Sequence, residues 1–118
     1  MKEDIIRILV VPVNEEPKIM TVQNDLRASQ EIVGGYIQTF PLDSVIPNPS
    51  LGAIAVLNEE GKITDGVKPN RTIYNNGKAF NIFYGKFFIC SLNGEHFGSI
   101  TPEQETYYKT LFADNSFG

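Results

Sequence analysis

Residues 5–13 read IIRILVVPV, and this β-branched run decides the fold. Pro12 and Pro17 close the run, which is too short for a helix and too apolar for a strand on the surface, so we predict an interior strand. A polar turn follows at 14–17, and residues 18–23 then predict a strand that returns antiparallel to the first. The chain therefore begins with a β-hairpin.

A short helix is predicted near 25–33. Asn24 or Asp25 can cap its start, because both side chains accept hydrogen bonds from the first free backbone N–H groups. Gly34 and Gly35 supply a left-handed stop, and a strand is predicted at 36–40. One face of this helix is expected to carry Leu26, Ser29, Ile32 and Val33.

Further strands are predicted at 53–57, 81–84 and 86–92, and Gly85 between the last two indicates a bulge or a close approach of backbone. The polar turn at 58–61 predicts a hairpin with Gly61 at positive φ. Residues 41–50 and 62–77 are interrupted by proline, glycine and asparagine, so we expect an irregular connection and a long ordered loop there.

A C-terminal helix near 102–112 is predicted by Thr101-Pro-Glu-Gln104, which fits a capping box with proline at the first helical position. We expect it to lie across the sheet on the face formed by Tyr107, Tyr108, Leu111 and Phe112. The fold class is α+β, with a single, mainly antiparallel, twisted sheet of about five to six strands. At 118 residues, the chain is expected to form one domain over 1–118.

The lone Cys90 excludes an internal disulfide, and its apolar surroundings predict a buried thiol on a strand. No stretch approaches the ~18 apolar residues that span a bilayer, so no membrane partner is expected. These features favour a cytoplasmic protein of a bacterial cell.

No catalytic set, metal site or cofactor site is predicted. His96 is the only histidine and lies in a sequence typical of a solvent-facing turn, while Gly34-Gly35 reads as a helix stop and not as a phosphate loop. The pairs Glu15/Glu16 and Glu59/Glu60 lie beside turns and are expected to be solvated. An enzyme would have to draw its nucleophile and base from Tyr84, Cys90, Glu95 and His96.

The distribution of charge gives the strongest indication of function. Residues 62–86 carry a net charge of +4, whereas the whole chain carries −4. A guanidinium fork suits phosphate or carboxylate, so this basic region predicts an anion site formed by Lys68, Asn70, Arg71, Tyr74 and Lys78. The alternative is that Arg71 pairs with a carboxylate of its own domain while Asn70 satisfies loop backbone. The acidic remainder argues against double-stranded nucleic acid as a partner.

The family resemblance is carried by residues 5–13, 31–37, 56–62, 69–71, 82–89 and 99–102. In these segments the chain resembles the small DUF3846 domains of bacterial phages, plasmids and mobile elements. The resemblance implies an accessory protein of such an element and carries over no activity or catalytic residue. We therefore expect a non-catalytic protein that binds a host protein, for example one of host defence, or a small anionic ligand.

Two other classes of function stay open. One is a small enzyme that acts on an anionic substrate. The other is a structural, self-associating domain, which is favoured if the aromatic run 80–88 exposes one face; a homodimer through a sheet edge would serve this class.

Overall fold

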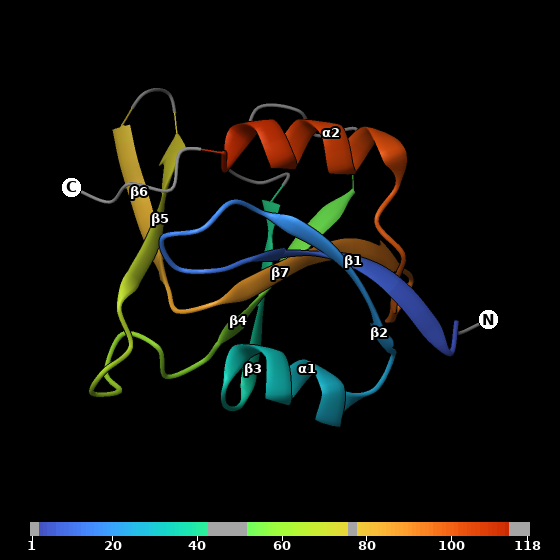
Figure 1. Ribbon diagram of the computed structural model, residues 1–118, viewed down its shortest axis with the longest axis horizontal. Helices are drawn as coiled ribbons and strands as arrows, with labels where there is room; N and C mark the ends of the chain where they lie inside the picture. Colours follow the sequence, from blue (N-terminus) through green and yellow to red (C-terminus); the bar gives the residue numbers. More distant parts are fainter. Residues whose placement is uncertain (1–2, 43–51, 76–77, 114–118) are drawn as a thin grey trace.

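The computed structural model describes residues 3–42, 52–75 and 78–113. A six-stranded antiparallel sheet forms its centre, with the order β2-β1-β7-β4-β3 and with β8 paired to the end of β7 (Figure 1). Its strands are β1 (Ile5–Val11), β2 (Lys18–Gln23), β3 (Ile37–Pro41), β4 (Ala53–Asn58), β7 (Phe87–Asn93) and β8 (His96–Gly98). The predicted α+β class and the opening hairpin are confirmed, and β1 is an interior strand.

Both faces of this sheet are covered. Successive side chains of a strand point to opposite faces, so a strand that is buried on both sides reads as a continuous apolar run. β7 shows this clearly, because Phe87 and Ile89 enter one core cluster while Phe88 and Cys90 enter the other. The predicted burial of the Cys90 thiol is confirmed.

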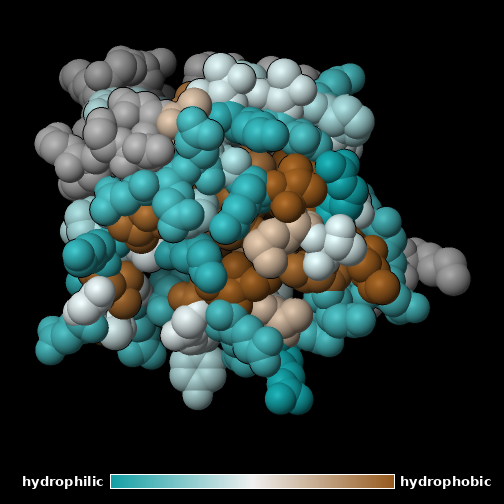
Figure 2. Space-filling model, viewed as in Figure 1, coloured by the Kyte–Doolittle hydropathy of each residue, from teal (hydrophilic) through white to brown (hydrophobic). Residues whose placement is uncertain are grey.

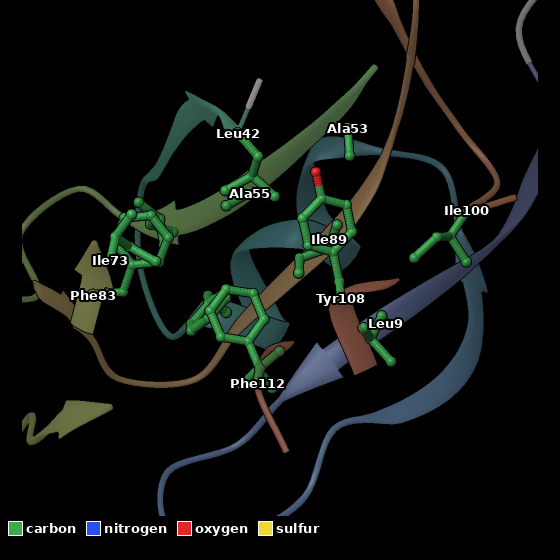
Figure 3. Packing of buried hydrophobic residues seen from close by; sticks show 13 residues of the cluster. Leu9, Leu42, Ala53, Ala55, Ile73, Phe83, Ile89, Ile100, Tyr108 and Phe112 are labelled. Carbon is green, nitrogen blue, oxygen red and sulfur yellow. The ribbon is translucent and has the colours of Figure 1, made fainter. Parts of the chain in front are cut away.

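One helix covers each face (Figure 1). α1 (Leu26–Val33) adds Val33 to the cluster that contains Phe88. α2 (Pro102–Leu111) lies across the opposite face, where Tyr108 and the following Phe112 pack over the cluster that contains Leu9 and Ile89 (Figure 3).

A second sheet lies on the α2 side and consists of β5 (Pro69–Asn75) and β6 (Lys78–Tyr84). Ile73 and Phe83 anchor it in the core, and the Phe83 ring meets the ring of Phe87 edge to face at 5.1 Å between centroids. The chain passes from β6 into β7 at Gly85, which has φ +75°. Its N–H donates to the Lys68 carbonyl at 2.8 Å, so the predicted close approach at this glycine is observed as a tight corner.

The helix ends follow the predicted signals. The Asp25 carboxylate accepts from the Ala28 N–H at 2.8 Å, and Gly34 ends α1 with φ +84°. At α2, Thr101 and Gln104 form the reciprocal capping box. The predicted helical faces are correct only in part, since Leu26 and Leu111 are exposed.

Two predictions about the middle of the chain are wrong. Residues 58–61 form no hairpin, because the neighbours of β4 are β3 and β7, and Gly61 does not have positive φ. Residues 62–77 are not a continuous loop, since β5 begins at Pro69, and with β6 it forms a sheet separate from the expected single one. Most of the predicted connection at 41–50 lies outside the described residues.

Candidate functional site

Arg71, the predicted centre of an anion site, is buried, with 5 % of its surface exposed. Its Nε and Nη2 atoms donate to the carbonyl of Phe112 at 3.2 and 3.1 Å, and Nη2 also donates to the carbonyl of Glu15 at 2.8 Å. Nη1 donates to the side-chain and main-chain oxygens of Asn70. The guanidinium thus ties β5 to the β1–β2 turn and to the end of α2.

Asn70 has a similar internal role and is 2 % exposed. Its Nδ2 atom donates to the carbonyls of Val11 at 2.8 Å and Gly85 at 2.9 Å. These two contacts fix the small sheet against the end of β1 and the β6–β7 corner. The alternative in which Asn70 satisfies backbone groups is therefore observed, and the Arg71 donors described above likewise meet oxygens of the chain itself.

The structure does not bring the five predicted residues together on one surface. Tyr74 and Lys68 are exposed, whereas Asn70 and Arg71 point inward. The Lys78 side chain lies outside the described part of the chain. Of the five predicted residues, Lys68 lines a groove, together with residues outside the predicted set.

This groove has a volume of about 630 Å³ and runs between the end of α1, the segment before β5 and the β6–β7 corner. In Figure 1, the C-terminal end of α1 points toward the yellow-green loop at the lower left that forms the opposite wall. Its polar and aromatic lining includes Glu31, Tyr36, Asn58, Glu60, Lys68 and Lys86. Three segments far apart in the sequence therefore meet here.

Close backbone packing shapes one wall of the groove. A Cβ atom at Gly35 would lie 3.0 Å from Asn58 Nδ2, so glycine lets the Asn58 side chain lie against the chain after α1. Asn58 Nδ2 donates to the Val33 carbonyl at 3.3 Å, and Asn58 Oδ1 accepts from the Glu60 N–H at 2.8 Å. Asn58 thereby joins the end of α1 to the turn that follows β4.

A second close approach fixes the other wall. A Cβ at Gly61 would lie 3.1 Å from the Tyr84 carbonyl oxygen, which explains a glycine at this position without positive φ. Together with the Gly85–Lys68 hydrogen bond, this contact holds the chain from β4 to β5 against β6. The two lysines of the groove project from this region.

The groove carries two acids, Glu31 and Glu60, and two lysines. Glu31 forms an exposed ion pair with Arg27, with 3.4 Å between its Oε1 and Nε of the arginine. Lys68 and Lys86 are both exposed, and within the described ranges neither ammonium group forms an ion pair or a side-chain hydrogen bond. Tyr36, with 67 % of its surface exposed, adds an aromatic ring beside them. The groove can therefore offer two cations and a phenol to a ligand.

Sequence reasoning missed Tyr36 and Lys86 as site residues. The signal that could have found them was the charge pattern of 62–86, which includes Lys86, combined with the Gly34-Gly35-Tyr36 segment of the family resemblance. Gly34-Gly35 itself acts as the predicted helix stop, since both N–H groups donate to the Gln30 carbonyl.

The four candidates for catalysis do not form a linked set. Cys90 is buried, and desolvation raises the pKa of its thiol to about 12, so it is a poor nucleophile at neutral pH. Glu95 and His96 are exposed at the β7–β8 hairpin, with His96 on β8 and not in the expected turn. Among the described residues no hydrogen bond joins any two of Tyr84, Cys90, Glu95 and His96.

Of the aromatic run 80–88, the described Phe83, Phe87 and Phe88 are buried. The condition that favoured a self-associating domain, an exposed face of this run, is therefore not met by these three rings. The predicted exposure of Glu15, Glu16, Glu59 and Glu60 is confirmed.

Two kinds of feature are absent from the described residues. These residues contain no cluster of three histidine, cysteine or acidic side chains placed to hold a metal ion. Neither of the helices found in this part of the chain has the length and apolar character needed to cross a membrane.

Comparison of the chain with curated proteins and with solved structures gave no match. Comparison with protein families gave one, which covers nearly the whole chain: residues 6–113 match the family described as "Domain of unknown function (DUF3846)", and the protein belongs to that family.

Proposed function

We propose that the protein is a non-catalytic accessory protein of a phage or mobile element, and that it binds a small anionic ligand in the groove beside α1. The observation that carries this proposal is the pair of exposed lysines, Lys68 and Lys86, on two chain segments that meet at the groove. Neither pairs with a carboxylate of the described chain, so each can give its charge to a ligand.

The size of the groove favours a small molecule. Its volume of about 630 Å³ lies within the range typical of ligand pockets. The Tyr36 ring could stack on a planar group while the ammonium groups bind phosphate or carboxylate. A long polyanion is disfavoured, because the chain as a whole carries a charge of −4 and nucleic-acid affinity requires many neutralised phosphates.

Native mass spectrometry of the protein purified from a bacterial host tests the proposal. We expect a fraction of the protein to retain a small added mass. That fraction should be smaller in Lys68→Ala and in Lys86→Ala. Lys109→Ala is the matched control, because it removes one exposed lysine from α2, away from the groove. The fraction of protein that retains the added mass should also fall as ionic strength rises, since salt screens exposed charges.

Inorganic pyrophosphate and adenosine monophosphate serve as defined probes. Binding to the folded state raises the thermal midpoint, and the rise should be smaller in the two groove variants than in Lys109→Ala. A bare protein mass together with no response to either probe would contradict a ligand of this class. Recovery of a stoichiometric host protein would instead favour the host-protein alternative, and turnover of a probe would favour the enzyme.

A further inference from the structure

One acidic side chain of the groove is available to a ligand. Glu31 pairs with Arg27. Glu60 is exposed, and among the side chains that the structure describes its carboxylate forms no ion pair or hydrogen bond. The turn holds this residue through its main chain, because the Glu60 carbonyl accepts from Thr64 Oγ1 at 2.7 Å. The carboxylate oxygens of Glu60, which accept hydrogen bonds and donate none, are therefore left for a ligand in the groove.

A backbone hydrogen bond brings Glu60 close to the exposed Tyr36. The Glu59 N–H donates to the Tyr36 carbonyl at 2.8 Å, which joins the turn after β4 to the chain after α1. Tyr36 and Glu60 both line the groove. This part of the groove therefore offers an aromatic ring for stacking and an acceptor for the edge of a stacked ring.

The cations come from the opposite side of the groove. The Gly85 N–H donates to the Lys68 carbonyl at 2.8 Å, so Lys86, the next residue along the chain, is held near Lys68. In Figure 2 the lower left of the molecule, where the loop before β5 lies, is mostly teal and white, whereas brown side chains gather in a band above α1. The groove thus combines a ring, a hydrogen-bond acceptor and two cations in mainly hydrophilic surroundings.

We propose that the ligand of this groove is a guanine nucleotide, an inference that rests on the proposed function. The base stacks on Tyr36 and donates from its N1–H and 2-amino groups to the two oxygens of Glu60. The phosphate binds Lys68 and Lys86. A volume of about 630 Å³ suits one ligand of this size.

The pattern of donors is what lets Glu60 select guanine. The Watson–Crick edge of guanine carries two adjacent donors, which a carboxylate accepts together. Adenine presents its 6-amino donor beside the N1 acceptor, so one carboxylate oxygen would face a lone pair. Hypoxanthine lacks the 2-amino group and makes only one of the two bonds. The mononucleotides of these three bases share the same sugar and phosphate, so differences in their affinity report on the base alone.

Titration with guanosine, inosine and adenosine monophosphates, followed by two-dimensional NMR of the backbone amides, tests the proposal. We expect guanosine monophosphate to bind about tenfold more tightly than adenosine monophosphate, with inosine monophosphate between them, because a bidentate pair discriminates at about this level. The shifted amides should include those of Gly35 and Gly85, which line opposite sides of the groove.

Glu60→Gln tests the source of the preference. Glutamine offers one acceptor and one donor, which match the adenine edge, so the ratio of the two affinities should fall to about one or reverse. Adenosine monophosphate should still bind, which also shows that the variant is folded. Glu59→Gln is the matched control, because it removes the same charge from the neighbouring exposed residue, which lies outside this groove. It should keep the wild-type preference.

Tyr36→Ala tests the stacking contact. It should weaken all three nucleotides by about fivefold or more and leave the binding of pyrophosphate unchanged, because pyrophosphate has no ring to stack. Tyr74→Ala is the matched control, since Tyr74 is similarly exposed at 57 % but lies on β5 and does not line the groove. It should bind the nucleotides like the wild type.

The results that would overturn the guanine assignment differ from those that would contradict anion binding. Equal affinities of the wild type for the three nucleotides, lowered alike by Lys68→Ala and Lys86→Ala, would overturn the assignment and leave the proposed function standing. So would a guanine preference that Glu60→Gln retains. No binding of any nucleotide or of pyrophosphate would contradict both proposals.

Discussion

The guanidinium of Arg71 donates two hydrogen bonds to the main-chain carbonyl of Phe112, from Nε at 3.2 Å and from Nη2 at 3.1 Å. A carbonyl in the last turn of a helix has no partner within the helix, so a cation placed there satisfies it and also meets the negative end of the helix dipole. Residues that are 41 positions apart in the chain are joined by this contact. It links the small β5–β6 sheet to α2.

We expect Arg71→Ala to lower the free energy of unfolding by about 2–4 kcal/mol, because buried carbonyls lose charged donors and a buried volume is left empty. Arg71→Lys should recover only part of this loss, since an ammonium group cannot reproduce the planar fork. Urea denaturation measures both effects. Arg27→Ala is the control: its pair with Glu31 is exposed, and the change should be within about 0.5 kcal/mol.

Thr101→Ala removes the N-cap of α2, where the threonine Oγ1 accepts from the Gln104 N–H at 3.1 Å. The expected loss of stability is about 1 kcal/mol. Thr106→Ala changes an exposed threonine inside the same helix and should be neutral or slightly stabilising, because alanine has the higher helix propensity. Equal denaturation midpoints for the two variants would count against the capping role.

Local signals explain which parts of the fold could be predicted. Asp25, Gly34 and Thr101 act on backbone groups within four residues, so the sequence near each helix end contains the whole interaction. β5 could not be predicted in this way, because Pro69 and Asn70 favour turns locally. Pairing with β6, and a hydrogen bond from Asn70 to Val11, 59 positions away, override that preference.

Only some of the groove residues could be predicted, for a related reason. Net charge along the chain located the basic region 62–86, and Lys68 and Lys86 both line the groove. A charge count does not say which side chains point outward, however. Arg71 follows a register shift in β5 and is buried, whereas Tyr36 comes from a segment that carries no basic residue.

Burial of Cys90 predicts a pH dependence of stability. Its pKa in the folded state is raised from 9.0 to about 12, because the thiolate would be desolvated. Below pH 9 the thiol is neutral in both the folded and the unfolded state, so its ionisation takes nothing from the free energy of unfolding. Above pH 9 only the unfolded state ionises, so the free energy of unfolding should fall by about 1.4 kcal/mol per pH unit until the folded pKa is approached.

Comparison with Cys90→Ala isolates this effect. The variant is less stable overall, but it lacks the thiol, so its stability should decline less steeply between pH 9 and 11 than that of the wild type. All other ionisable groups are common to both proteins, so their contributions cancel in the difference. Identical slopes would show that the thiol is not desolvated. In the native protein we also expect thiol reagents to react with Cys90 only as fast as the chain opens.

Gly35 and Asn58 offer a direct test of whether the Val-Gly-Gly-Tyr and Asn-Glu-Glu-Gly segments of the family build the groove wall. A Cβ at position 35 would lie 3.0 Å from Asn58 Nδ2 and 3.3 Å from Oδ1, so Gly35→Ala must displace the side chain that joins Val33 to Glu60. Gly35 does not have positive φ, and the substitution therefore adds no backbone strain of that kind. We expect a loss of about 1–2 kcal/mol.

Asn58→Ala should cost a similar amount, since two backbone groups lose their partner. The double variant distinguishes the proposed cause from two independent defects. Once Asn58 is truncated, the added methyl group at position 35 has no amide to displace, so the double variant should be less destabilised than the sum of the two single changes by at least about 0.5 kcal/mol. Additive losses in urea denaturation would mean that Gly35 is required for another reason, and that the contact with Asn58 does not hold the groove wall.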